Sequence, residues 1–343
     1  MAGDGATGAC PAHAVHVLGG ATMGTLWQVS ASAPAGADLH VLHDGIQACL
    51  DRVVAQMSTW EPHSDISRYN RAPAGTWQAL PQPFFDVLRE ALAMAARTDG
   101  AVDPTVGPLV EAWGFGPSGN GGHVPEADVL AAARARTGWQ RVTLDPAGQR
   151  ALQPGGVGLD LSGIAKGYGV DAVVDWLRAS GIPAALVEVG GELRGFGRKP
   201  GGSPWQVLAE AWPEDDAGHR DGSSDAPSGA DDPGDGPCII ALEDAAVASS
   251  GDHWHHFEHA GRRYAHTIDP RRGAPVEHAP AAVTVVAATA LAADAWATAL
   301  TVLGERDGFE LAQREGIAAR WVLRDGAAVR ARTTDAFGQH LAT

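Results

Sequence analysis

The sequence has little cysteine and few basic residues. Its three cysteines, Cys10, Cys49 and Cys238, are odd in number and far apart, which excludes a disulfide framework and a CxxC metal or redox motif. The 343 residues include 25 Lys and Arg against 41 Asp and Glu, a formal net charge of −16. That sign is wrong for binding the phosphates of nucleic acid or an anionic membrane surface. We therefore expect no nucleic-acid partner.

Long hydrophobic runs are also missing. The least polar long run, residues 280–293, contains Thr284 and Thr289 and is far shorter than the ~20 apolar residues that span a bilayer. Residues 1–16 show neither the basic start nor the apolar stretch of a removable signal. The sequence thus predicts no transmembrane segment, and its visible N-terminus is cytoplasmic in character.

The chain is long enough for one large domain or two lobes. Hydrophobic residues make up 45% of it and charged residues 19%, which fits a folded globule. We expect the domain to span residues 14–335, between a disordered N-terminus of residues 1–13 and a tail of residues 336–343. Residues 213–237 carry eight acidic residues against Arg220 alone and lack large apolar residues, so they predict a disordered acidic insertion.

Hydrophobic spacing predicts a chain of mixed helices and strands. Apolar residues at steps of three and four predict helices over residues 38–57, 83–97, 125–137, 164–180, 289–303 and 307–315. Two short strands are expected around a glycine bend within residues 14–32, and a hairpin within 251–267. Further strands are expected over residues 139–144, 157–161, 184–189, 192–197, 205–211, 238–242, 282–287, 318–323 and 327–332.

A carboxylate and a hydroxyl lie four residues apart in a late predicted helix. Asp294 and Thr298 therefore share one helix face a turn apart, among small alanines. Two hard oxygens suit Mg²⁺ or Ca²⁺ better than zinc. Taken alone, such a pair is more often a solvated face or a local hydrogen bond, so both interpretations stay open at this point.

A glycine-rich segment that contains Asp160 and Lys166 leads from a predicted strand into a predicted helix. Exposed amides at a helix N-terminus, with a lysine beside them, favour a phosphate or pyrophosphate. The pattern matches neither the GxGxxG fingerprint nor the P-loop. Tight helix packing with Lys166 in solvent explains the glycines equally well.

Histidines gather between residues 253 and 266. Four of them are His253, His255, His256 and His259. On a strand, His256 points away from His253 and His255, and no HExxH arrangement exists, so an exposed polar hairpin is favoured over a zinc site. His266 precedes a Pro/Gly turn, where it could act as a general base or simply bond to the turn.

Short distinctive motifs lie in order along nearly the whole chain. The longest is DLSGIAKGYG from Asp160, followed by Gly190-Gly191-Glu192. The others are GATMGT (20–25), MSTW (57–60), SDISRYN (64–70), AVDPTVGPL (101–109), WGFG (113–116), HTIDP (266–270) and DAWATAL (294–300). This ordered set, far more specific than any single motif, resembles the ApbE-type FAD:protein FMN transferase family, also described as flavin transferases.

The resemblance implies an activity and a fold. Members cleave the pyrophosphate of FAD with Mg²⁺, attach FMN through a phosphoester to a Thr or Ser hydroxyl of an acceptor protein, and release AMP. FAD would then be the substrate, Mg²⁺ the cofactor and an acceptor flavoprotein the partner. The implied fold is α+β of the T-fold-like ApbE type, with mixed, largely antiparallel sheets, helices, and FAD in a cleft between lobes. Exported members imply a periplasmic or membrane-associated location, so the compartment stays open.

The resemblance also assigns site residues. The metal would be held by Asp294, Thr298 and an oxygen of Gly163, which here can only be its backbone carbonyl. FAD contacts carry over to Met23, Trp60, Ala101, Val102, Asp103, Asp160, Lys166 and Ile268. His266 is the candidate base for the acceptor hydroxyl, and Lys166 would neutralise charge on the phosphates.

Two positions depart from the family pattern. Gly163 stands where other members often have a larger residue, and Glu192 replaces the Asp that is common after the double glycine. Two other functions use the same features. A Mg²⁺-dependent FAD pyrophosphatase would have water as the nucleophile, and a non-catalytic flavin-binding module would have no nucleophile at all.

Overall fold

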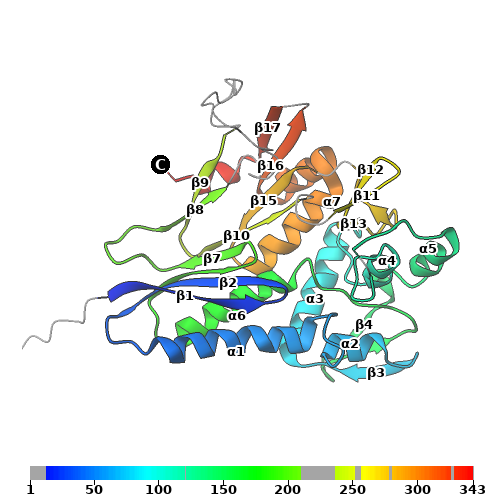
Figure 1. The fold of residues 1–343 in the computed structure, drawn as a ribbon, viewed down its shortest axis with the longest axis horizontal. Coiled ribbons are helices and arrows are strands. Elements are labelled where there is room, and N and C mark those ends of the chain that lie inside the picture. The colour runs from blue at the N-terminus through cyan, green and yellow to red at the C-terminus, as the bar shows by residue number, and fades with distance from the viewer. Residues whose placement is uncertain are drawn as a thin grey trace, which may run out of the picture.

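The computed structural model describes residues 13–119, 121–209, 236–251, 256–277, 280–325 and 328–342. Its largest element is a sheet in which all neighbouring strands are antiparallel (Figure 1), with the order β1-β2-β6-β7-β10-β15-β16-β17. The strands are β1 His13–Thr22, β2 Thr25–Pro34, β6 Ala184–Val189, β7 Glu192–Phe196, β10 Ala245–Ser250, β15 Ala282–Ala287, β16 Ala318–Asp325 and β17 Ala328–Thr333.

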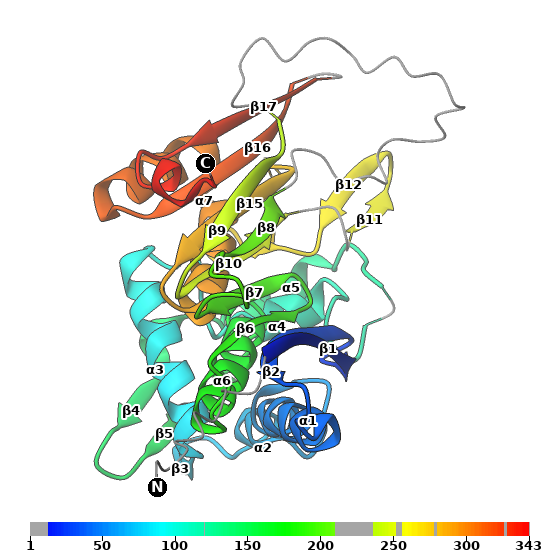
Figure 2. The ribbon, with the colours of Figure 1, turned by 90° about the vertical axis from the view of Figure 1, so that its left-hand side faces the viewer.

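Three long helices cover one face of this sheet (Figures 1 and 2): α1 Leu39–Met57, α6 Ala165–Ala179 and α7 Ala290–Glu315. Helix α6 contacts both of the others. Its apolar stripe, which includes Val170, Val173 and Leu177, packs with Ile46 of α1 and Val187 of β6 in one buried cluster. The apolar stripe of α6 thus packs against α1 and the sheet at once.

The other face is partly covered by the antiparallel pair of β8 Trp205–Ala209 and β9 Cys238–Leu242. Trp205 and Ile240 pack there with Val247 of the sheet and with Phe337. Phe337 begins the short 3-10 helix η3, Phe337–His340, and is fully buried. The described part of the segment expected to be a tail therefore packs on the domain.

Smaller elements lie beside the sheet (Figure 1). They are α2 Asp65–Asn70, β3 Thr76–Ala79, α3 Gln82–Arg97, α4 Gly107–Ala112, α5 Ala127–Arg134, the 3-10 helix η1 Trp139–Arg141, β4 Thr143–Asp145, β5 Arg150–Gln153, β11 His256–His259, β12 Arg262–Ala265, β13 Ile268–Asp269 and β14 Ala274–Pro275. Strands β3, β5 and β4 form a separate antiparallel sheet, in that order.

The predicted α+β class with largely antiparallel sheets is confirmed, but two predicted strands are wrong. Residues 139–141 form a 3-10 helix rather than the start of a strand. Residues 157–161 join no strand ladder beyond one bridge from Gly158 to Val106. The side chain of Asn70 satisfies both backbone groups of Leu159 instead, at 2.7 and 2.9 Å.

Two other differences have local causes. Strand β10 was not expected, because its sequence AAVASS has a single β-branched residue, and its pairing with β7 and β15 makes it a strand. The two predicted late helices form one continuous element, interrupted only at Gly304, where φ is 76°. Residues 1–12, residues 213–235 of the expected insertion, and His253 and His255 lie outside the described residues.

No helix in the described part of the chain combines the length and the hydropathy that a membrane span requires.

Helices α6 and α7 meet at a glycine. A Cβ added at Gly167 would lie 2.2 Å from the carbonyl oxygen of Ala290, so no side chain fits between the two backbones. Gly167 lies in the first turn of α6, and Ala290 is the first residue of α7. The two helix N-termini are therefore held against each other.

We expect Gly167→Ala to lower the free energy of unfolding by about 1–3 kcal/mol, the usual cost of overpacking, although alanine favours a helix by about 1 kcal/mol. Urea denaturation measures this difference. Gly338→Ala is the matched control, because a Cβ there meets nothing within 4 Å, and we expect a change within about 0.5 kcal/mol. A Gly167→Ala protein as stable as the control would contradict the close helix contact.

Candidate functional site

A lysine and a glutamate are paired where α6 begins. Lys166 Nζ lies 2.5 Å from Oε1 of Glu192, the first residue of β7. Glu192 is only 2% exposed, and its Oε2 has no hydrogen-bond partner among the described residues. It follows Gly190 and Gly191, which both have positive φ (58° and 99°), so the sharp turn between β6 and β7 delivers the carboxylate to the lysine.

Asp294 of α7 reaches the same place. Its Oδ2 accepts a hydrogen bond of 3.0 Å from the amide of Gly167, in the first turn of α6. The Asp294 side chain is buried, with 5% exposure. An anion at a helix N-terminus is favoured by the unpaired amides and by the helix dipole. The contact between Gly167 and Ala290 makes this approach possible.

Charge in this cluster is unbalanced. Burial and the charge of Asp294 raise the pKa of Glu192 to about 8, against the opposing effect of Lys166. Burial lowers the pKa of Lys166, but the carboxylates of Glu192 and Asp294 outweigh it, so that this pKa is raised. Burial also raises the pKa of Asp294. Two buried carboxylates face one amine, so the cluster favours a further positive charge, as a proton or as a cation.

Thr298 and Gly163 lie side by side next to this cluster. A Cβ added at Gly163 would lie 3.1 Å from Oγ1 of Thr298, and Thr298 is one helical turn beyond Asp294. No group of three or more His, Cys, Asp and Glu side chains in the described ranges is arranged to hold a metal. A cation here would therefore need the hydroxyl of Thr298 and backbone oxygen besides Asp294, a set of hard donors that fits Mg²⁺ or Ca²⁺.

Two loops run together beside the start of α6. The amide of Asp160 donates to the carbonyl of Pro104 at 2.9 Å. Asp160 Oδ1 accepts from the Ser162 amide at 2.8 Å. Asp103 is buried, and its carboxylate accepts from Thr105 and from the amide of Trp139. Both aspartates thus shape the loops that border the cluster, and a contact of either with FAD stays a prediction.

The predicted residues Ala101 and His266 approach α7 from another side. Ala101 is 1% exposed and packs with Ala265 and with Val302 of α7. His266 follows Ala265 and is half-buried. The Val102 amide donates to the hydroxyl of Thr98 at 3.3 Å. The segments around residues 101 and 266 therefore both meet α7 near the turn after Thr298.

Ile268 and Trp60 differ sharply in exposure. Ile268 is 7% exposed and packs in a cluster with Leu109 and Trp113. Trp60 follows α1 and is 62% exposed. Trp60 is therefore open to a ligand, whereas only a small part of Ile268 is.

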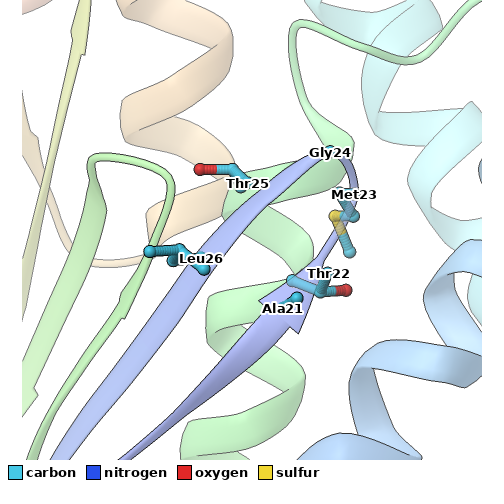
Figure 3. Close-up of a pocket in the computed structure, with 6 residues that line it drawn as sticks. All are labelled: Ala21, Thr22, Met23, Gly24, Thr25 and Leu26. Atoms are coloured by element: carbon cyan, nitrogen blue, oxygen red, sulfur yellow. The ribbon is translucent and has the colours of Figure 1, made fainter.

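The tip of the β1–β2 hairpin lies over α6. Met23 and Gly24 form its two-residue turn, with φ of 49° and 73°, the positive values that a type I′ turn requires. Met23 Cε would be 3.1 Å from a Cβ at Gly169 of α6. Residues 21–26 line a depression of about 500 Å³, and Figure 3 shows Met23 and Leu26 on opposite sides of the hairpin. Met23 is thus placed at the edge of the site.

The histidine-rich hairpin packs through Phe257 and Tyr264 on the buried group of Leu109, Trp113 and Ile268. His256 and His259 of β11 are exposed, and Nδ1 of His256 lies 3.2 Å from the guanidinium of Arg263. This placement fits the polar hairpin that the sequence favoured.

The sequence identified one important residue only as a departure. Glu192 stands out in the sequence only as a replacement for Asp, yet it holds Lys166, and one of its buried oxygens has no partner among the described residues. The available signal was the double glycine before a strand, which indicates a sharp turn. The partner of this carboxylate, however, depends on how β7 packs against α6.

Known proteins share this sequence and fold. The model of the ApbE family matches residues 23–321. A FAD:protein FMN transferase of Salmonella typhimurium is 36% identical over 316 residues, which cover 91% of this chain and 85% of that protein. The apo crystal structure of Pseudomonas stutzeri flavinyl transferase ApbE superposes with a TM-score of 0.84 at 39% identity, covering 96% of this chain and 98% of that one. The flavin transferase ApbE from Vibrio cholerae superposes with a TM-score of 0.83 at 34% identity, covering 96% of this chain and 100% of that one. With agreement over almost its full length in sequence and in fold, the chain belongs to the ApbE family.

Proposed function

We propose that this protein is a FAD:protein FMN transferase, which moves FMN from FAD to a Thr or Ser hydroxyl of an acceptor protein. The observation that carries the proposal is the buried group of Asp294, Glu192 and Lys166 at the N-terminus of α6. It occurs in a chain whose relatives carry that activity in their names.

The reaction exchanges one phosphorus–oxygen bond for another. The acceptor hydroxyl oxygen attacks the phosphorus on the FMN side of the FAD pyrophosphate and forms a phosphoester. The bond from that phosphorus to the bridging oxygen breaks, and AMP leaves with that oxygen. The hydroxyl proton passes to a base, for which we propose His266. An alcohol has a pKa far above neutrality, so the attack needs such a base.

We propose Asp294, Thr298 and the carbonyl of Gly163 as ligands of Mg²⁺. The support is the excess of carboxylate over amine in the buried cluster and the contact between Gly163 and Thr298. When bound, Mg²⁺ supplies positive charge that offsets the repulsion between a pyrophosphate and an incoming nucleophile.

Lys166 is proposed to contact the phosphates of FAD. Glu192 holds its ammonium group at 2.5 Å, so the side chain is oriented before a ligand arrives. The first amides of α6 lie beside it and favour the same anionic groups. The remaining proposed FAD contacts are Met23, Trp60, Ala101, Val102, Asp103, Asp160 and Ile268, and we place them around a cleft that ends at Lys166.

Incubation with FAD, Mg²⁺ and an acceptor domain tests the function. We expect covalent FMN on the acceptor, seen by mass spectrometry, with one AMP released for each FMN attached, and no transfer when EDTA replaces Mg²⁺. Free FMN and AMP without acceptor labelling would identify a FAD pyrophosphatase instead. Flavin binding without turnover would reduce the protein to a flavin-binding module.

We expect Asp294→Asn to slow FMN transfer by roughly a hundredfold or more, because it removes the charge that attracts the cation while an amide oxygen can still accept from Gly167. The rate is measured as AMP release at saturating FAD. Asp175→Asn, at an exposed site on α6, is the control and should be unchanged. Full transfer by a folded Asp294→Asn protein would remove Asp294 from the metal site.

We expect Lys166→Ala to weaken FAD binding about ten- to hundredfold, the usual cost of losing a charged hydrogen bond. Quenching of flavin fluorescence measures the affinity, and circular dichroism checks the fold. Lys199→Ala is the control, because Lys199 lies over the ring of Trp205, which packs on the face of the sheet opposite α6. Equal FAD affinity of the Lys166→Ala and Lys199→Ala proteins would exclude a phosphate contact for Lys166.

A further inference from the structure

A second buried aspartate joins α6 to α7. Asp171 of α6 is buried. Its Oδ1 accepts from the Ala290 amide at 3.0 Å and its Oδ2 from the Leu291 amide at 2.9 Å. These are the first two amides of α7, which no carbonyl within the helix can satisfy. The helix is thus capped from a neighbouring helix, besides the ordinary cap that Thr289 gives to the Ala292 amide.

The two helices cap each other. Asp171 of α6 accepts from the first turn of α7, and Asp294 of α7 accepts from Gly167 in the first turn of α6. The close contact of Gly167 with Ala290 lies at the same crossing. The position of Asp294 relative to Lys166 is therefore fixed by contacts in both directions.

Strand β7 holds α6 by two pairs of opposite polarity. Glu192 and Arg194 are two residues apart on β7 and so share a face. Glu192 forms an ion pair with Lys166, and Arg194 forms one with Asp171 at 2.6 Å. The Asp171 and Arg194 side chains are 11% and 12% exposed, so water screens this pair little. Rotating or sliding α6 would break both pairs at once.

Loss of the Asp171 cap would act on the site through α7. Asp294 lies only one turn beyond Ala290, the residue that Asp171 holds. Phosphoryl transfer depends on positioning, and a displacement of about 1 Å can cost roughly a hundredfold in rate. A carboxylate that touches no substrate can therefore control the reaction.

We propose that Asp171, held by Arg194, is a positioning residue for the transfer site: by capping α7 it keeps the Asp294 carboxylate on the amide of Gly167 and beside Lys166. The kinetic consequence of this proposal rests on the proposed function, whereas the placement of Asp294 does not.

The test is amide hydrogen exchange together with kinetics on Asp171→Asn. In the absence of FAD and Mg²⁺, we expect about tenfold faster exchange or more at Ala290 and Leu291 and also at Gly167, which Asp171 does not touch. In the transfer assay we expect the Mg²⁺ concentration for half-maximal rate to rise about tenfold, with a smaller change in the KM for FAD. Asp175→Asn, an exposed aspartate one turn beyond Asp171 on α6, should change none of these.

Faster exchange at Ala290 and Leu291 alone, with normal protection at Gly167 and a normal Mg²⁺ requirement, would overturn the proposal and leave Asp171 as a local cap. Should Asp171→Asn fail to fold, Arg194→Gln loosens the carboxylate without removing it, and the same comparison at Gly167 decides. If the wild-type protein transfers no FMN, the proposed function fails, and the exchange at Gly167 still tests the placement of Asp294.

Discussion

Burying two carboxylates beside a single lysine is the constraint on which the site depends. Asp294 and Glu192 lose their hydration in the fold, and such a loss is tolerated only when charge and hydrogen bonds replace the water. Lys166 supplies the charge, and the Gly167 amide supplies a hydrogen bond. One oxygen of Glu192 is left without a partner in the described structure. Burying this charged cluster lowers the stability of the fold, and such clusters with shifted pKa values are typical of functional sites.

Local spacing was enough to predict part of this arrangement. The four-residue step from Asp294 to Thr298 fixes them on one helix face whatever the helix packs against, and α7 confirms the helix. The glycine-rich turn before Lys166 predicted the start of α6 equally directly. The hairpin turn at Met23 also follows from a short glycine signal. These features depend only on neighbours within a few residues.

The rest depends on contacts between distant segments. The hydrogen bond from the Gly167 amide to Asp294 joins residues that are 127 apart in the chain. A local hydrophobic pattern does not predict a contact over that separation. Residues 157–161 read as a strand because they are apolar, yet Asn70, 89 residues before Leu159, takes the backbone groups that a strand would have used. Strand β10 shows the opposite case, in which two flanking strands impose a structure that its alanines and serines do not favour.

The raised pKa of Glu192 bears on how the proposed cation site responds to pH. Burial raises the pKa of this carboxyl group to about 8, so the fold favours its protonated form more than water does. A divalent ion bound at the proposed site would oppose this protonation, and the pH would then set how tightly the ion binds. In that case a proton and the proposed cation compete for the same buried negative charge, and acid weakens the binding of the cation.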